Sequence, residues 1–121
     1  MPPVSEQMKA WSAALASELQ TWPDVTTRPF FAFTALYRKK QIFGLLPRTR
    51  AIETPNSIAF KIERPSAAIR RELQSDGRVD CSHLRKGSWF RYEMSSDSDL
   101  RATLKWLAKS YDLARKRPII K

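Results

Sequence analysis

The residues of this chain best suited to covalent chemistry are a single cysteine and a single histidine. Cys81 and His83 lie two positions apart, so an extended strand puts both on one face, with Asp80 beside them to orient the imidazole. A thiol next to such a base can act as a nucleophile. However, no glycine-bearing oxyanion loop and no second histidine accompany the pair. No lysine or arginine lies within two positions of Cys81, so we expect a buried, protonated thiol and a non-enzymatic protein.

Metal and cofactor sites have little support in the sequence. A tetrahedral zinc site needs three or four ligands, whereas the chain offers one Cys and one His. Its three glycines cannot form a phosphate-binding loop or a dinucleotide fingerprint. Asp97 and Asp99 flank the expected start of the last helix, where negative charge favours the helix dipole. We therefore expect no metal, no cofactor and no small-molecule substrate.

Positive charge, by contrast, points to a partner. The 121 residues include 22 Lys and Arg against 12 Asp and Glu, which gives a formal net charge of +10. The segment from residue 25 to residue 50 contains no acidic side chain at all. A polyanion is therefore attracted first to the middle and the end of the chain, and nucleic acid is the partner that this charge favours.

Four groups of basic residues are the candidate contacts for phosphate: a run of three in an expected turn, one pair in each of two loops, and a ridge at i, i+4 spacing on the last helix. In chain order they are Arg38, Lys39, Lys40, Arg48, Arg50, Arg85, Lys86, Arg101, Lys105 and Lys109. A charge run is more often a solvated turn than a contact. The nucleic-acid interpretation is strengthened if the fold brings any two groups onto one face.

Trp106 and Leu113 support an alternative. Both are expected beside the basic ridge, outside the stripe that packs the last helix. A tryptophan there could stack on a base, but it more often packs against a neighbouring element or subunit. The second interpretation is therefore a protein-interaction domain, or a weak homodimer, that uses the Trp106/Leu113 patch.

Periodicity and turn chemistry predict the elements that position these residues. Ser5 is expected to cap a first helix whose apolar residues recur at helical spacing as far as Trp22, before Pro23 stops it. Residues 33–37 and 41–46 are typical of two strands of a hairpin, with the basic run at its tip.

The rest of the chain alternates strands and helices. Further strands are expected from Val25 to Pro29 and at residues 57–62, 79–82 and 89–94. Ser66 is expected to cap a short helix that ends with Gly77 in the left-handed conformation. Asp97 is expected to cap a last helix that ends at Pro118. The predicted core stripe of this helix is Leu100, Leu104, Leu107, Tyr111 and Ala114.

The resulting order, α-β-β-β-β-α-β-β-α, predicts an α+β domain with N-terminal, middle and C-terminal helices and an antiparallel sheet covered mainly on one face. The length suits one domain, residues 1–121, with residues 1–4 and 118–121 frayed. One cysteine suits a reducing compartment, so we expect a cytoplasmic protein. Residues 1–5 lack the features of a signal peptide, and no apolar run reaches the ~18 residues that a bilayer span requires, so no membrane association is expected.

The stretch from His83 to Tyr111 resembles a known family. The phrase His83-Leu84-Arg85-Lys86-Gly87-Ser88-Trp89, an aromatic strand and a helix finishing in Ser110-Tyr111 are similar to the C-terminal half of MmcQ/YjbR-like domains. Pro29-Phe30, the hairpin at residues 37–43 and the strand at residues 58–62 resemble the middle section of that family. The hairpin is also similar to the N-terminal domain of TfoX-type competence regulators.

The resemblance implies an architecture of aromatic strands and a closing helix. It also implies nucleic-acid binding, because the family fold has been likened to the double-wing modules of some DNA-binding regulators. The chain departs from the family at residues 38–40, where three basic residues replace a turn that tends to contain glycine. That departure leaves the geometry of the tip open and raises its charge.

Overall fold

The computed structural model describes residues 3–52, 54–81 and 88–116. Its elements, in chain order, are α1 (Glu6–Leu19), β1 (Val25–Phe30), β2 (Phe33–Arg38), β3 (Gln41–Pro47), β4 (Ser57–Lys61), α2 (Ala67–Ser75), β5 (Val79–Asp80), β6 (Trp89–Glu93) and α3 (Asp99–Lys116). This is the predicted α-β-β-β-β-α-β-β-α order, and the predicted α+β class with an antiparallel sheet is confirmed.

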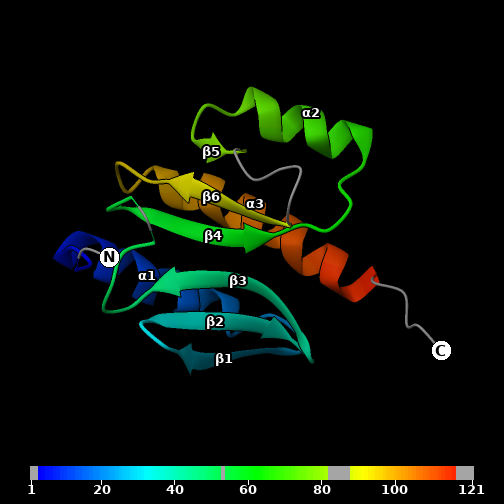
Figure 1. Ribbon diagram of the computed structural model, residues 1–121. Coiled ribbons are helices and arrows are strands. Elements are labelled where there is room, and N and C mark those ends of the chain that lie inside the picture. Colours follow the sequence, from blue (N-terminus) through cyan, green and yellow to red (C-terminus); the bar gives the residue numbers. More distant parts are fainter. Residues whose placement is uncertain (1–2, 53, 82–87, 117–121) are drawn as a thin grey trace.

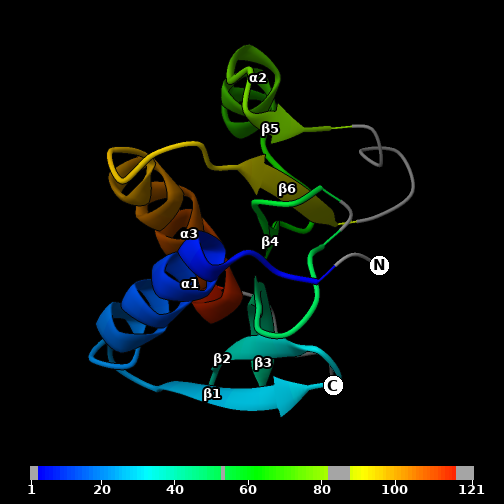
Figure 2. The same cartoon turned by 90° about the vertical axis from the view of Figure 1, so that its left-hand side faces the viewer.

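The six strands form one sheet in the order β1-β2-β3-β4-β6-β5, and every neighbouring pair is antiparallel. Helices α1 and α3 lie on one face of this sheet, while α2 lies beyond the β5 edge (Figure 1). No described helix covers the other face, as the rotated view shows (Figure 2). Among the described elements, helices therefore cover one face of the sheet only.

Helix α1 begins where the sequence predicts. The Ser5 side chain accepts a hydrogen bond from the Met8 backbone N–H at 3.0 Å, which satisfies one of the free donors of the first turn. The helix ends at Leu19, earlier than expected, and Gln20 is its C-cap. Trp22 still reaches the core from the following turn, since its ring meets the Tyr111 ring edge-on at 5.1 Å.

Large aromatic rings fill the space between the sheet and α3. Phe60 of β4 lies between the rings of Phe90 and Trp106, with centroids 5.7 and 5.4 Å away. Gly44 lets α3 come close to β3, because a Cβ at this position would lie 2.9 Å from the Leu107 Cδ2 atom. The close approach, and not a special backbone conformation, explains glycine here.

The buried stripe of α3 differs from the predicted one. Leu107 and Tyr111 are buried as expected, but Leu100, Leu104 and Ala114 are only half-buried. The face is completed by Thr103, Trp106 and Ser110, all at most 4% exposed. The helix is rotated relative to the prediction because it contacts α2 and α1 as well as the sheet.

The N-terminus of α3 is held by carboxylates in two ways. Helix α3 begins at Asp99, and the Asp99 side chain, not that of the expected cap Asp97, accepts hydrogen bonds from the Ser95 and Ser96 N–H groups at 2.7 and 3.1 Å. The bond from the Ser95 backbone is the main reason that the pKa of Asp99 lies below its ordinary value. Asp97 instead accepts a hydrogen bond from the Trp11 indole at 2.7 Å, which ties α1 to the start of α3.

The expected left-handed Gly77 is not observed. Ser66 caps α2 as predicted, accepting from the Ile69 N–H at 3.2 Å. The chain then leaves the helix through Asp76 in an extended conformation, and Gly77 has no positive φ. Positive φ occurs instead at Asp24, Phe31, Lys39 and Arg64.

The two ends of the described chain are both packed. Pro3 pairs with Arg50 through a β-bridge and Val4 is 7% exposed, so these two residues do not fray as expected. Near the other end, the Tyr111 hydroxyl donates to the Pro23 carbonyl at 2.9 Å. Residues 1–2 and 118–121, also expected to fray, lie outside the described residues.

Among the helices described, none combines the length and hydropathy needed to cross a bilayer.

Candidate nucleic-acid interface

Arg38, the first residue of the predicted basic run, is part of the core. It is 8% exposed, its guanidinium donates to the Tyr111 carbonyl at 3.1 Å, and its Cζ lies 3.8 Å from the centroid of the Tyr111 ring. The prediction that Arg38 contacts phosphate is therefore wrong. The residue alternates with its neighbours across the pleat, and its side chain turns toward α3 instead of solvent.

Lys39 and Lys40 form the exposed two-residue tip of the β2–β3 hairpin. Lys39 has a φ of 55°, a left-handed conformation that favours glycine, and its N–H is held by the Asp24 carbonyl at 2.9 Å. Within the described residues neither lysine makes an ion pair. Both ammonium groups can therefore contact a phosphate at this end of the hairpin.

Arg48 and Arg50 lie at the other end of β3. Seven residues of extended chain separate them from the tip, or about 23 Å. The Arg48 guanidinium donates to the Phe31 carbonyl at 2.8 Å, and Arg50 is exposed beside the Pro3 bridge. The two predicted groups therefore mark opposite ends of the same strand pair.

The helical ridge lies in a different layer. Arg101 and Lys105 are exposed on α3, whereas Lys109 is half-buried and its Nζ lies 3.2 Å from Glu72 Oε1 of α2. Since α3 covers the opposite face of the sheet, the ridge does not join Arg48 on one surface. Arg85 and Lys86, with His83, lie outside the described residues.

The Trp106/Leu113 patch predicted as an interaction surface does not form. Trp106 is 4% exposed, its ring stacks on Phe60, and its indole N–H donates to Asp76 Oδ2 at 3.0 Å. Leu113 is half-buried against the core. Phe60 of β4 and Asp76, the residue after α2, are the neighbours that the sequence did not show, and they hold the tryptophan within the chain.

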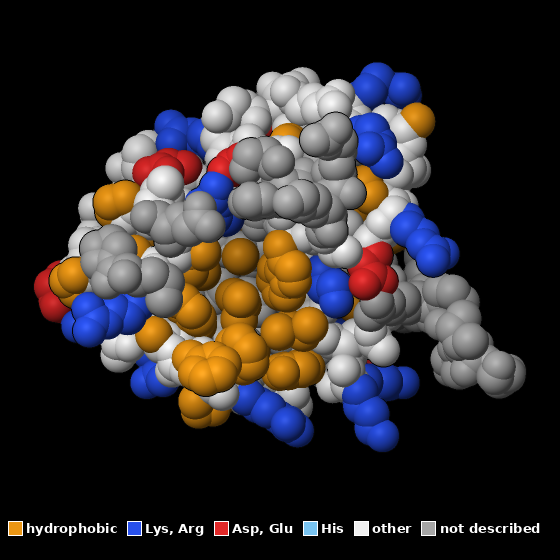
Figure 3. Space-filling view, viewed as in Figure 1, with side chains coloured by type: hydrophobic (Ala, Val, Ile, Leu, Met, Phe, Trp, Pro, Cys, Tyr) orange, Lys and Arg blue, Asp and Glu red, His pale blue; other side chains and the backbone are white. Residues whose placement is uncertain are grey.

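The uncovered face of the sheet carries an apolar surface that the sequence analysis missed. Five side chains on β1, β2 and β3 make up this surface, here called the apolar strip. They are Phe30, Phe33, Tyr37, Ile42 and Leu45, with Phe30 41% exposed and the others half-buried. The strand register puts Phe30 beside Phe33 and Tyr37 beside Ile42 on the same face. Hydrophobic side chains gather over this part of the sheet, with lysine and arginine along its lower rim (Figure 3).

Arg28 brings a cation onto the strip itself. It is exposed on β1, pairs in register with Ala35, and its Cζ lies 5.5 Å from the centroid of the Tyr37 ring. Lys39 and Lys40 stand at one end of the strip and Arg48 at the other. One cation therefore lies on the strip and others lie at both ends of its strands, in a segment that has no acidic residue.

The signal that could have revealed this face is weak in the sequence. Residues 41–46 are apolar almost without interruption, so periodicity does not say which side chains face away from the helices. Only the i, i+4 aromatics Phe33 and Tyr37, on the same side of β2, hint at a second apolar surface.

Cys81 has the geometry of an unreactive thiol. It is half-buried, its Sγ lies 3.5 Å from the Leu73 carbonyl, and burial, with a smaller contribution from the Asp76 carboxylate, raises its pKa. A raised pKa opposes formation of the thiolate that nucleophilic catalysis needs.

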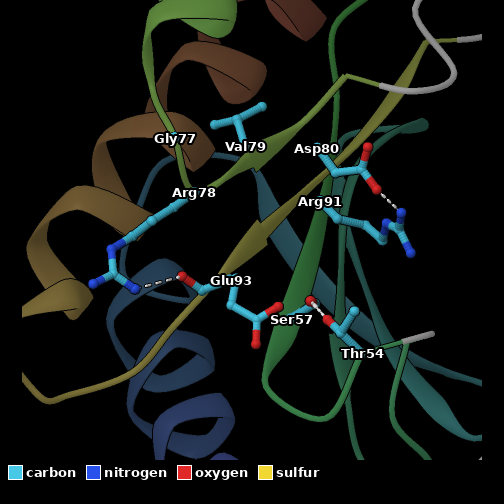
Figure 4. Close-up of a pocket in the computed structure, with 8 residues that line it drawn as sticks. All are labelled: Thr54, Ser57, Gly77, Arg78, Val79, Asp80, Arg91 and Glu93. Carbon is cyan, nitrogen blue, oxygen red and sulfur yellow. Dashed lines mark hydrogen bonds and ion pairs between the residues drawn. The ribbon is translucent and has the colours of Figure 1, made fainter.

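A hollow of 380 Å³ lies where β4, β5 and β6 meet, on the same uncovered face (Figure 4). Asp80 and Arg91 form an ion pair across it, and Thr54 is hydrogen bonded to Ser57. The Glu93 carboxylate points toward these two hydroxyls. Two arginines line the hollow, but Arg91 is paired with Asp80 and Arg78 lies 3.5 Å from Asp99 Oδ2. Because both are paired and Glu93 adds a further carboxylate, the hollow is a poor site for phosphate, and the strip is the better candidate.

Within residues 3–52, 54–81 and 88–116, no three His, Cys, Asp or Glu side chains are grouped as metal ligands. Comparison of the chain with protein-family models, with curated proteins and with solved structures found no match to any of them, so the geometry described above is the basis for assigning a function.

Proposed function

We propose that this protein is a non-enzymatic domain that binds a polyanion, namely nucleic acid, through the apolar strip and the cations around it. The observation that carries the proposal is that Arg28 lies on the apolar strip, over the Tyr37 ring, while Lys39 and Lys40 follow one end of β2 and Arg48 follows the far end of β3, on a sheet face that no described helix covers. Basic side chains neutralise phosphates, and aromatic rings offer stacking surfaces for bases.

The raised pKa of Cys81 supports a protein without a nucleophilic thiol. We also propose a cytoplasmic location, since a lone thiol suits a reducing compartment. Kinship with the MmcQ/YjbR-like domains is part of the same proposal. It is supported by the aromatic strand β6 followed by the closing helix α3, the arrangement that the resemblance implies.

The proposal is tested by fluorescence anisotropy with labelled single-stranded and duplex DNA. Four neutralised phosphates on a single strand give a slope of log affinity against log salt of about −2.8, a loss of about 50-fold between 50 and 200 mM salt. The contacts are not base-specific, so oligonucleotides of different sequence should show the same dependence.

A matched pair of charge reversals separates a local site from net charge. Changing Lys39 and Lys40 to glutamate lowers the net charge by as much as changing Arg70 and Arg71, which are exposed on α2. We expect the first pair to weaken binding much more than the second, because α2 lies at the opposite edge of the sheet from β1.

Equal losses in the two double variants would mean that only net charge matters. If the wild type shows no salt-sensitive association at 50 mM salt, the proposal is refuted. In that case a concentration-dependent dimer would identify the strip as a protein contact.

A further inference from the structure

Phe31, in the turn between β1 and β2, has a backbone conformation that glycine adopts more readily than phenylalanine. Its φ is 56°, in the left-handed region where a Cβ is disfavoured and glycine or asparagine is common. Its side chain is 84% exposed and meets the Phe30 ring edge-on at 4.8 Å. Both the strain and the exposure of a large apolar ring oppose stability. Among the described residues, the ring contact given for Phe31 is with Phe30, itself 41% exposed, so little burial offsets these costs.

The turn is nevertheless fixed in place. Arg48 donates through its guanidinium to the Phe31 carbonyl at 2.8 Å, while the N–H groups of Arg48 and Thr49 donate to the Ala32 carbonyl at 3.0 and 2.9 Å. Two consecutive carbonyls of the turn are thus bound by the loop after β3. The ring is presented to solvent by a rigid turn, which reduces the entropy lost when a ligand binds.

Phe31 stands at one end of the apolar strip. Phe30 pairs in register with Phe33, and Tyr37 lies four residues further along β2, or about 13 Å away. The aromatic surfaces therefore follow the strand direction, with the Arg28 guanidinium over the Tyr37 ring. A guanidinium plane can itself stack on a base.

We infer that the ligand is a single-stranded nucleic acid whose bases stack on the strip, with Phe31 as the anchor at its end. This inference depends on the proposed function and specifies its substrate. In a duplex the faces of the bases are already stacked, so a duplex could use only the cations and would leave the exposed rings without a partner. A single strand can place its phosphates near the cations and stack its bases on the rings. A sheet face of this size binds about two or three bases.

Binding is measured with three labelled probes of equal length: a mixed-sequence DNA strand, its duplex, and an abasic strand. We expect the wild type to bind the mixed-sequence strand most tightly. Phe31→Gly should weaken that complex by about 5- to 150-fold, the loss of one stacked base, and should change the affinity for the other two probes little.

Phe31→Gly also separates binding from folding. Glycine relieves the left-handed strain, so the variant should melt at a temperature equal to or above that of the wild type while it loses affinity. Phe31→Trp keeps a stacking surface and should retain binding to the mixed-sequence strand.

If the wild type binds all three probes equally and Phe31→Gly changes none of these affinities, the inference is wrong while polyanion binding stands. If no probe binds at 50 mM salt, the proposed function itself fails. A dimer of the wild type that Phe31→Gly dissociates would also overturn the inference, because the strip would then be a contact between two copies of the chain.

Discussion

Trp106 offers the sharpest test of the packing of α3. Trp106→Ala removes a ring that is 4% exposed and stacked on Phe60, and such truncations cost about 3 to 5 kcal/mol. The loss of the indole hydrogen bond to Asp76 is included in that range. With a urea m-value of about 2 kcal/mol/M, a loss of about 4 kcal/mol lowers the unfolding midpoint by about 2 M.

The assay is urea unfolding followed by far-UV circular dichroism, since tryptophan fluorescence changes when the residue is removed. Trp106→Phe keeps a ring on Phe60 but loses the hydrogen bond, and should cost about 1 to 2 kcal/mol. Trp89→Ala is the matched control, because Trp89 is half-buried on the uncovered face with Lys61 Nζ 6.0 Å from its ring. An unchanged midpoint for Trp106→Ala, or an effect no larger than that of Trp89→Ala, would refute the burial described here.

Three further outcomes are expected. Arg38→Met should lower the free energy of unfolding by about 2 kcal/mol, since it removes a charge-assisted hydrogen bond to a buried carbonyl. Changing Lys39 and Lys40 to glutamate should leave the melting temperature nearly unchanged. Equal effects would contradict the buried position of Arg38. Asp99 has a lowered folded pKa, so its carboxylate stabilises the fold above the ordinary value of 3.8 and this contribution is lost as the pH falls through the folded pKa. Asp99→Asn should therefore lower the melting temperature at pH 7, and a difference that persisted undiminished well below pH 3.8 would exclude this explanation. Cys81 has a raised pKa, so native protein at pH 7 should react with iodoacetamide much more slowly than urea-unfolded protein, and equal rates would show that the thiol is not protected.

Local signals in the sequence were enough to predict the order of elements and the caps at Ser5 and Ser66. Each depends on residues within a few positions of one another, and the structure confirms them. The element order also predicted the antiparallel sheet, because two-residue turns join β1 to β2 and β2 to β3.

Features that depend on distant residues were predicted poorly. The predicted stripe of α3 is wrong because Asp76, thirty positions earlier and just after α2, accepts the hydrogen bond of the Trp106 indole. Arg38 appeared to be a solvated tip residue because its partner, Tyr111, is 73 positions away. The sequence predicts only part of the candidate site: it indicates Lys39, Lys40 and Arg48 but not the apolar strip, since uninterrupted apolar runs do not reveal which face of a sheet is covered.

Hydrogen bonds between residues far apart in the sequence limit how early this protein can complete its fold. The Trp11 indole reaches Asp97 and the Tyr111 hydroxyl reaches Pro23, across 86 and 88 positions. Such contacts close late, because the loop entropy must be lost before they form. During synthesis at about 5 to 20 residues per second, α1 therefore waits on the order of ten seconds for its partner helix. In that interval the apolar side of α1 can pack only on β3 and not on α3. The unfinished core therefore adds to the apolar surface that the growing chain exposes on the β1–β3 strands.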